Sequence, residues 1–299
     1  MSSPAPTSTS LFDGPQMGWI DRAAGLYHSA ASALFGTEKG AQIKSLLNGT
    51  PVRHRLHPAL VDVPIGAWTT AMHLDGLALL TNGNRRRQFE TGADAAIILG
   101  IAGALPAALT GTADWVDVSG RPRRYGMAHA MLNTVALASY GVSLLARRGD
   151  RRNSALALAS AGFGFLALSA SATIGGDMAY NLGVNVARPP APRPPRKFTA
   201  VMQSSELGPG QHRRVEVGKA PVLLVRDESG ELHALQHWCT HAGGPLSEGE
   251  VENGVVTCPW HGSKFCVADG RPIQGPATAP LAVYQVREEN GQILVGREA

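Results

Sequence analysis

Four long apolar stretches constrain this chain more than any other feature, and they lie at residues 58–80, 92–113, 127–145 and 154–174. Each approaches the roughly 20 predominantly apolar residues that an α-helix needs to cross a bilayer. Short arginine-rich segments separate them, at residues 84–87, 121–124 and 147–152. Arginine is tolerated at the membrane interface, where its guanidinium reaches the headgroups. The pattern predicts an all-α, four-helix transmembrane bundle over residues 57–186.

The alternative is a soluble helical bundle rich in alanine and glycine, because the first apolar stretch contains Asp62, His73 and Asp75. The spacing of the arginine segments favours the membrane, since it allows one crossing between each pair. The same clustering explains the net charge of +4. Basic loops at a membrane surface account for that charge better than a nucleic-acid partner, which we therefore exclude.

The segments around the bundle have their own compositions. Residues 1–17 are rich in serine, threonine and proline and predict a disordered tail, with no cleavable secretory signal in view. Residues 18–56 carry apolar side chains at helical spacing and predict one or two amphipathic helices. Residues 187–197 contain many prolines and predict a semi-rigid, extended linker.

After the linker, residues 198–299 alternate short β-type runs with turn residues, which predicts an all-β antiparallel domain. The expected strands are 214–217, 221–225, 232–235, 255–257, 281–286 and 293–295. Turns are expected at residues 227–230 and 289–291, where glycine follows polar residues. The chain is thus expected to have two domains of different fold class.

Two pairs of metal-binding side chains stand in this second domain. Cys239 and His241 form a Cys-x-His pair, and Cys258 and His261 form a Cys-x-x-His pair after sixteen intervening residues. A set of two thiolates and two imidazoles suits zinc, and it also suits an iron–sulfur cluster in which two histidines replace two cysteines on one iron. Three cysteines are too few for a disulfide framework, so metal binding is the favoured interpretation.

This pattern closely resembles the Rieske iron–sulfur family. The resemblance rests on the ligand spacing, on residues 243–246 after the first pair and on residues 262–265 after the second. It implies a 2Fe-2S cluster with Cys239 and Cys258 on one iron and His241 and His261 on the other. An iron held by neutral histidines carries less negative charge than one held by thiolates, so the centre is expected to accept and donate one electron.

The resemblance also implies which residues surround the cluster: Leu246, Trp260, Ser263 and Phe265. In the respiratory branch each loop adds a cysteine to a disulfide, but here Gly244 and Trp260 stand at those positions. Phe265 stands where that branch has a tyrosine whose hydroxyl bonds to sulfur. The loss of that donor predicts a lower potential, as in the ferredoxin and oxygenase branches. Cys266 is expected to be a buried free thiol.

The membrane region is similar to a bacterial family of predicted four-helix membrane proteins without an agreed activity. The resemblance lies in residues 57–66, in Asp75 and in residues 110–114. Ionisable residues inside membrane helices are functional candidates by default. With four crossings, His57, Asp62, Asp114 and His129 fall near one face, whereas His73, Asp75 and Asp94 fall near the other.

A functional and a structural hypothesis follow for the histidines of the first face, and the functional one has two forms. His57 and His129 are either ligands of a haem b or the edge of a quinone site; otherwise they cap helices and pair with Asp62 or Asp114. Sequence alone leaves both open. A cytoplasmic head is favoured by the absence of a signal and of disulfides, although Arg151 and Arg152 before the fourth stretch could act as an export signal.

Taken together, the residues predict a multi-pass protein of a bacterial cell membrane, anchored in the lipid bilayer, that transfers one electron between an unknown donor and an unknown acceptor, such as a reductase, a quinone or an oxidase. The alternative is a redox sensor or an assembly protein whose cluster reports redox state. Only 38 residues follow His261, so no mononuclear-iron catalytic domain is expected after the cluster. The oligomeric state is open.

Overall fold

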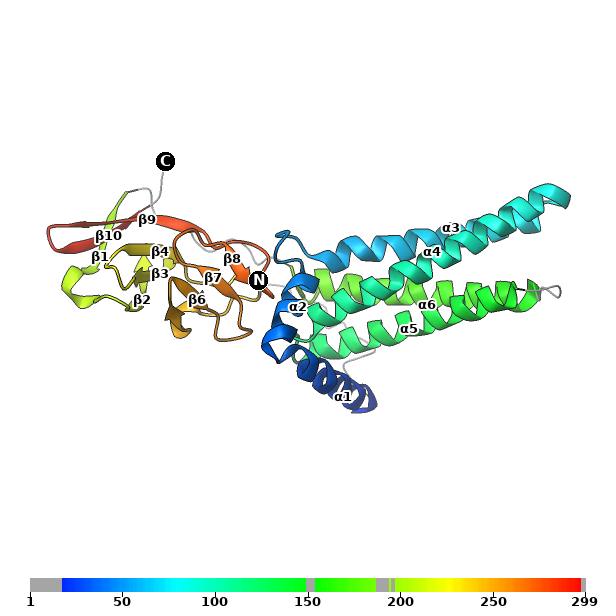
Figure 1. Cartoon of the computed structure of the whole chain (residues 1–299), viewed down its shortest axis with the longest axis horizontal. Coiled ribbons are helices and arrows are strands. Elements are labelled where there is room, and N and C mark those ends of the chain that lie inside the picture. The colour runs from blue at the N-terminus through cyan, green and yellow to red at the C-terminus, as the bar shows by residue number, and fades with distance from the viewer. Residues whose placement is uncertain (1–17, 149–153, 187–193, 195–196, 297–299) are drawn as a thin grey trace, which may run out of the picture. The chain divides into compact units, whose positions relative to one another are not determined.

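The computed structural model describes residues 18–148, 154–186, 194 and 197–296 (Figure 1). The expected tail at 1–17, the arginine pair at 151–152 and nearly all of the linker 187–197 lie outside these residues. The described chain forms two compact units. The first contains residues 18–34 and Leu56–Val184, and the second contains Phe35–Arg55 together with the chain from Asn185 onward.

The helical unit contains five helices, at Gly18–Phe35 (α1), Leu56–Leu79 (α3), Gly83–Trp115 (α4), Arg121–Ala146 (α5) and Ser154–Tyr180 (α6). Each expected apolar stretch coincides with one of the helices α3 to α6, except that α3 ends one residue before the expected end at residue 80. The described chain has six α-helices in all, because α1 and α2 (Glu38–Asn48) precede the bundle. Three helices, α4, α5 and α6, are long and apolar enough to cross a membrane.

Helix α4 begins nine residues before its predicted start, at Gly83 instead of residue 92. Its first turns are polar, and Arg86 donates to Glu90 one turn later at 3.0 Å. Such i,i+4 ion pairs stabilise an exposed helix surface. The second arginine-rich segment is likewise helical, since α5 begins at Arg121 with a proline in its first turn. Helical structure therefore continues beyond the apolar part of the sequence.

The bundle packs as two helix pairs, α3 along α4 and α5 along α6. The pairs meet where the Trp68 ring of α3 stacks on the Tyr140 ring of α5, with centroids 4.3 Å apart. Gly100 of α4 makes room for this contact, because a Cβ there would lie 2.2 Å from the indole nitrogen of Trp68. Close packing through small residues is typical of membrane helices.

The second unit contains two antiparallel sheets. The larger sheet has the order β1-β10-β9-β4-β3-β2, and its strands are Thr199–Gln203 (β1), His212–Val217 (β2), Ala220–Arg226 (β3), Leu232–Gln236 (β4), Val283–Glu289 (β9) and Gln292–Gly296 (β10). The smaller sheet has the order β5-β6-β7-β8, with strands Val251–Glu252, Val255–Thr257, Lys264–Cys266 and Pro272–Gln274. The predicted antiparallel β fold is confirmed, and the sequence missed β1, β5, β7 and β8.

The β9–β10 hairpin closes with a two-residue turn in which Asn290 and Gly291 have φ of 52° and 75°. Two left-handed residues match the twist of the flanking strands, which explains why asparagine and glycine stand there. This turn was expected at residues 289–291, and it fixes the pairing of Glu289 with Gln292.

Strand β3 is buried on both faces and separates two cores. Successive side chains of a strand point to opposite faces. Leu223 and Val225 therefore enter the core that also holds Cys239 and Cys258, whereas Val222 and Leu224 enter the core of the large sheet. The two cysteines thus sit on a fully apolar base.

Candidate functional site

Two loops carry the Cys and His pairs, one after β4 and one between β6 and β7. They share a backbone hydrogen-bond pattern: each cysteine donates its N–H to the carbonyl five residues later and accepts the N–H of the glycine four residues later. The bonds are Cys239 N to Gly244 O at 2.9 Å, Gly243 N to Cys239 O at 2.9 Å, Cys258 N to Ser263 O at 2.8 Å and Gly262 N to Cys258 O at 3.1 Å. Gly243 and Gly262 have φ of 76° and 69°. Each loop therefore curls back on its own cysteine.

The curled loops bring the two thiols together. Cys239 and Cys258 are buried and within hydrogen-bond distance of each other, and neither forms a disulfide. The hydrogen bond between them raises the pKa of Cys239 and lowers the pKa of Cys258 to about 6. The sulfur of Cys239 accepts the backbone N–H groups of His241 and Ala242. The sulfur of Cys258 accepts those of Trp260 and His261. Such donors stabilise thiolate charge.

The two imidazoles lie beside each other, with His241 and His261 ring centroids 4.9 Å apart at 85°. Nδ1 of His241 is buried and has no hydrogen-bond partner among the described residues. Burial, followed by the positive charges of Arg55, His261 and Lys44, lowers the pKa of His241 to about 3. A buried imidazole nitrogen without a partner is energetically costly, so it is a position where a bound metal would supply the missing interaction.

A third loop, at residues 275–282 between β8 and β9, is hydrogen-bonded to both of the first two loops. Ala277 donates its N–H to Ser263 Oγ at 3.0 Å, and Thr240 Oγ1 donates to Ala279 O at 2.7 Å. Ser263 therefore has a structural partner in the third loop. The sequence analysis missed Thr240, which stands between the cysteine and the histidine of the first pair. No local pattern could have shown that its hydroxyl bonds to Ala279, 39 residues later.

The other expected neighbours divide into buried and exposed groups. Leu246 and Phe265 are fully buried in the core beneath the cysteines. Trp260 is 54% exposed, and its ring lies edge-on to His261 with centroids 6.4 Å apart. Cys266 was expected to be buried, but this free thiol is only half-buried in β7, outside both loops, where it hydrogen-bonds Asp269.

Gly244 explains one departure from the respiratory pattern. A Cβ at this position would lie 2.8 Å from Cys258 Sγ and 3.1 Å from Cγ of Trp260. A cysteine at 244 would therefore require the Trp260 ring to move. In this chain the glycine and the tryptophan are packed as a pair.

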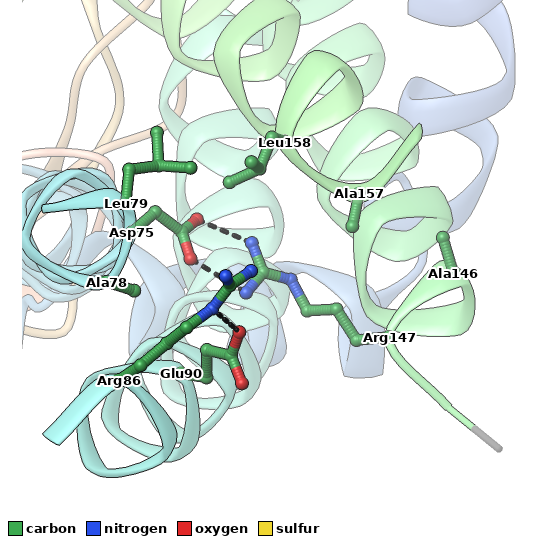
Figure 2. A pocket seen from close by; sticks show the side chains of 9 residues that line it. All are labelled: Asp75, Ala78, Leu79, Arg86, Glu90, Ala146, Arg147, Ala157 and Leu158. Carbon is green, nitrogen blue, oxygen red and sulfur yellow. Dashed lines mark hydrogen bonds and ion pairs between the residues drawn. The ribbon is translucent and has the colours of Figure 1, made fainter. Parts of the chain in front are cut away.

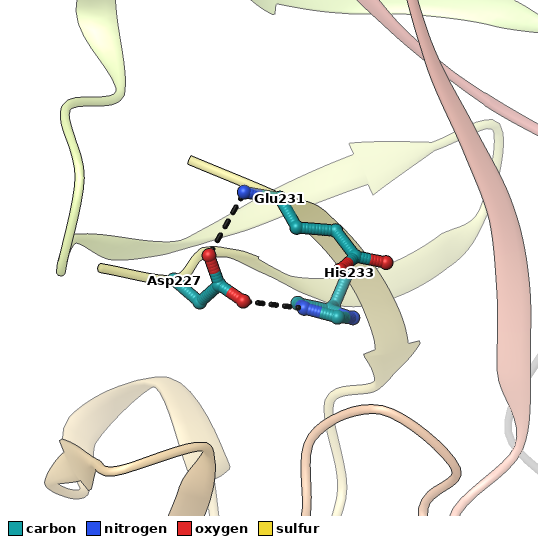
Figure 3. A group of neighbouring side chains, drawn as sticks. All are labelled: Asp227, Glu231 and His233. Atoms are coloured by element: carbon teal, nitrogen blue, oxygen red, sulfur yellow. Dashed lines mark hydrogen bonds and ion pairs between the residues drawn. The ribbon is translucent and has the colours of Figure 1, made fainter. Parts of the chain in front are cut away.

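A separate group of potential ligands is formed by Asp227 and Glu231 of the turn between β3 and β4 and by His233 at the start of β4 (Figure 3). Its geometry is explained by the turn. Asp227 accepts from Ser229 Oγ at 2.7 Å, from the Glu231 N–H at 2.8 Å and from His233 Nε2 at 3.2 Å. These bonds, with Ser229 contributing most, lower the pKa of Asp227 to about 2.

In the helical unit, the structure places His57 and His129 close enough to interact electrostatically. His57 Nδ1 bonds Ala107 O at 2.9 Å, and His129 Nδ1 bonds Ser171 O at 2.8 Å. Nε2 of His129 contacts the Asn133 amide at 3.0 Å, so both of its ring nitrogens are engaged. The side chains tie α3 to α4 and α5 to α6.

The two acidic residues expected near these histidines differ in their exposure to solvent. Asp62 is exposed on α3, whereas Asp114 is buried near the end of α4. Nothing in the described geometry or in the protein comparisons supports a haem or a quinone at these four residues.

The other polar layer contains a buried ion pair that the sequence did not reveal (Figure 2). Arg147, at the end of α5, makes two hydrogen bonds to Asp75 of α3, one of them at 2.8 Å, and one to Asp94 of α4 at 3.3 Å. Its Nε donates to Ser143 Oγ at 3.2 Å. The pair lines a cavity of about 160 Å³, together with Arg86 and Glu90. Arg147 was expected in an interface loop, but it satisfies two carboxylates inside the bundle.

Comparison with known proteins gives two family matches. The model of the Rieske [2Fe-2S] domain matches residues 197–285, and the model of a predicted membrane protein domain of unknown function, DUF2231, matches residues 53–188. Both agree with the resemblances inferred from the sequence.

Individual relatives match the Rieske region. The ferredoxin component of biphenyl 2,3-dioxygenase from Rhodococcus jostii is 41% identical over 34% of this chain and 94% of its own length. Human apoptosis-inducing factor 3 is 43% identical over 32% of this chain, but the match spans only 16% of that protein.

Among solved structures, the ferredoxin of carbazole 1,9a-dioxygenase from Nocardioides aromaticivorans is 28% identical, covering 34% of this chain and 99% of that one with a TM-score of 0.33. The sequence relatives and the family matches together classify both halves of the molecule. This chain belongs to the Rieske [2Fe-2S] family through its C-terminal domain, which follows a DUF2231 membrane-protein domain.

Proposed function

We propose that this chain is a membrane-anchored electron carrier whose Rieske domain exchanges one electron with separate donor and acceptor proteins. The observation that carries the proposal is the paired-loop geometry, which places two thiols in contact and two imidazoles side by side over an apolar base. The ferredoxin relatives of the domain support electron transfer as its role. The identity of the donor and the acceptor is a separate question.

In this proposal Cys239 and Cys258 hold one iron of a 2Fe-2S cluster, and His241 and His261 hold the other. The donor set fits, because both sulfurs receive backbone N–H groups and the buried Nδ1 of His241 has no hydrogen-bond partner within the described part of the chain. The cluster supplies reversible one-electron chemistry. The residues around it position the ligands: the third loop braces Ser263 and Thr240, and Trp260 covers Gly244.

The helical part is proposed to anchor this head by four crossings, α3 to α6. Helices α4, α5 and α6 have the required length and apolarity. We include α3 because it packs along α4 and because its Asp75 is paired with Arg147 inside the bundle. A paired carboxylate is far less costly in a membrane than an unpaired one.

The domain limits proposed are 57–186 for the membrane part, 187–197 for the linker and 198–299 for the Rieske domain, with residues 18–56 in front. We place the head in the cytoplasm, in keeping with its three free thiols. Protease digestion of sealed vesicles of both orientations tests this: the β unit should be cut only in inside-out vesicles, and cutting only in right-side-out vesicles would reverse the assignment.

The function is tested with the detergent-purified full-length protein. Iron and acid-labile sulfide are quantified, and the visible spectrum is followed during titration with a one-electron reductant. We expect one electron per chain, broad reversible bleaching and rapid reoxidation by a one-electron acceptor. Bleaching without rapid exchange, coupled to a redox-dependent change in partner binding, would favour the sensor alternative. Zinc without iron would overturn the electron-carrier proposal.

A further inference from the structure

The short helix α2 belongs to the β unit, although it precedes the membrane helices in the sequence. It packs against β8, next to the third loop (Figure 1). Two buried hydrogen bonds hold it there. Ser45 Oγ accepts the N–H of Gly275 at 2.9 Å, and Thr50 Oγ1 donates to Ala277 O at 3.1 Å.

The contact is closely fitted. A Cβ on Gly275 would lie 2.5 Å from Thr50 Oγ1, so no larger residue can stand there without displacing the helix or the loop. Ser45 and Thr50 are 9% and 3% exposed. Helix α2 is also sharply delimited, because Thr37 caps its start and Gly49, in the left-handed region, ends it. Because the helix ends at Gly49, the next residue, Thr50, can bond to the third loop.

The contact reaches the metal-binding loops through one residue. Ala277 receives the Thr50 hydroxyl on its carbonyl and donates its N–H to Ser263 Oγ. Ser263 in turn accepts the N–H of Cys258 on its carbonyl. A segment that precedes the membrane helices in the sequence is therefore linked to the Cys258 loop by three successive hydrogen bonds.

This segment also brings two positive charges to the site. Lys44 is adjacent to Ser45, and Arg55 ends the segment; both side chains are half-buried. The hydrogen bonds of Ser45 and Thr50 hold the segment that carries both charges against the loop that bonds Ser263 and Thr240, beside the two Cys and His pairs. A positive charge held near a redox centre by a fixed segment acts in both oxidation states, and it favours the reduced state, which carries more negative charge.

We propose that residues 38–55 form a cationic cap on the Rieske domain, which raises the reduction potential of the centre through Lys44 and Arg55. The inference rests on the proposed cluster assignment. In this arrangement Ser45 and Thr50 are positioning residues: they hold the cap on the third loop, and Lys44 and Arg55 supply the field.

The test is a redox titration of the full-length protein, comparing the wild type with Lys44→Gln, Arg55→Gln and the double variant. Each single change should lower the equilibrium constant for reduction about threefold, the order expected for one charge acting through a partly solvated surface. The double variant should lower it about tenfold, which is about 59 mV for a one-electron couple. Lys39→Gln is the matched control, because Lys39 lies on the same helix and is exposed.

The outcomes separate this inference from the proposed function. A shift in the double variant no larger than that of Lys39→Gln, in protein with full iron content and an unchanged spectrum, would overturn the cap. A wild type without a reducible cluster would instead contradict the proposed function. If the double variant loses iron, Lys44→Arg with Arg55→Lys provides the second test: retained potential supports the cap, and a fall as large as tenfold contradicts a role for charge.

Discussion

The two units bury polar side chains in opposite ways. In the helical unit the guanidinium of Arg147 is shared between Asp75, Asp94 and Ser143, so its donors are used within the bundle. In the β unit, Nδ1 of His241 is buried with no partner among the described residues. Polar groups that are buried and paired hold elements together, whereas one that is buried and unpaired beside two thiols marks a place for a bound group.

The β unit itself sharpens this distinction. Both ring nitrogens of His237 are also buried without a described hydrogen bond, and its ring packs edge-on against Trp238. Its partner in that contact is an indole ring, which does not ligate a metal. An unpaired imidazole is thus insufficient evidence for a metal site, and the adjacent Cys239 and Cys258 are what distinguish His241.

The largest effect is expected from removing a proposed ligand. Cys258→Ala should abolish the visible absorption of the cluster, because one iron loses a thiolate. Cys266→Ala is the matched control, since this thiol lies in β7 outside both loops, and it should leave the spectrum unchanged. Iron analysis and visible spectra of the two purified variants provide the measurement. A full cluster spectrum in Cys258→Ala would contradict the ligand assignment.

The second-largest effect is expected from breaking the buried ion pair of the helical unit. Arg147→Met leaves the buried carboxylate of Asp75 without its cation, and loss of one partner of a buried ion pair typically costs about 3–5 kcal/mol. We expect a large fall in the thermal unfolding midpoint in detergent, with the Rieske spectrum intact before unfolding. Adding Asp75→Asn should recover part of the loss. Arg86→Gln serves as the control for charge removal, because its ion pair with Glu90 is partly exposed.

If Arg147→Met unfolds no earlier than Arg86→Gln, the buried pair does not stabilise the bundle. The stabilising role assigned to buried, paired polar groups in the helical unit would then be wrong.

A smaller effect is expected at the packed glycine of the first loop. Gly244→Ala places a Cβ 2.8 Å from Cys258 Sγ and close to the Trp260 ring, and overpacking of this kind costs about 1–3 kcal/mol. The variant should hold less iron per chain and unfold at a lower temperature. Gly208→Ala, where a Cβ would meet its nearest atom at 3.6 Å, should behave as the wild type. Equal iron content in both variants would refute the tight fit.

The smallest effect concerns the exposed turn that resembles a cation site. Ser229→Ala should raise the pKa of Asp227 from about 2 toward its ordinary value, because the hydroxyl is its strongest partner. The lowered pKa of Asp227 stabilises the fold above the ordinary carboxyl range and ceases to do so as the pH falls through 2. NMR titration of the carboxyl in both proteins measures the shift. An unchanged pKa would assign the effect to other neighbours.

The two Cys and His pairs could be recognised in the sequence because the pattern that marks them is local. Within each loop the cysteine, the histidine and the turn glycine lie within five residues, and the same backbone hydrogen bonds recur in both loops. The antiparallel β fold followed from short β-type runs alternating with turn residues, and the helices followed from the length and apolarity of the four stretches; both are confirmed. Strands of two or three residues, such as β5 and β7, are too short to leave a pattern.

Long-range pairings were not predictable from one sequence. Arg147 belongs to an arginine-rich run that looks like an interface loop, and only the fold brings it to Asp75, 72 positions away. Similarly, Ser45 and Gly275 are separated by 230 positions, so α2 could be recognised as a helix but not as part of the β unit. Contacts of this kind depend on how elements far apart in the sequence pack together, and composition and spacing do not reveal that packing.

The central claim is that Cys239, His241, Cys258 and His261 together hold a 2Fe-2S cluster. The most direct test is pulsed EPR of the reduced full-length protein labelled with ¹⁵N-histidine. The account predicts two histidine nitrogens coupled to the electron spin, of which one is lost in His241→Cys if the cluster is retained, while His237→Gln keeps both. A reduced cluster with no coupled histidine nitrogen, or a protein that holds zinc and has no EPR signal, would contradict it.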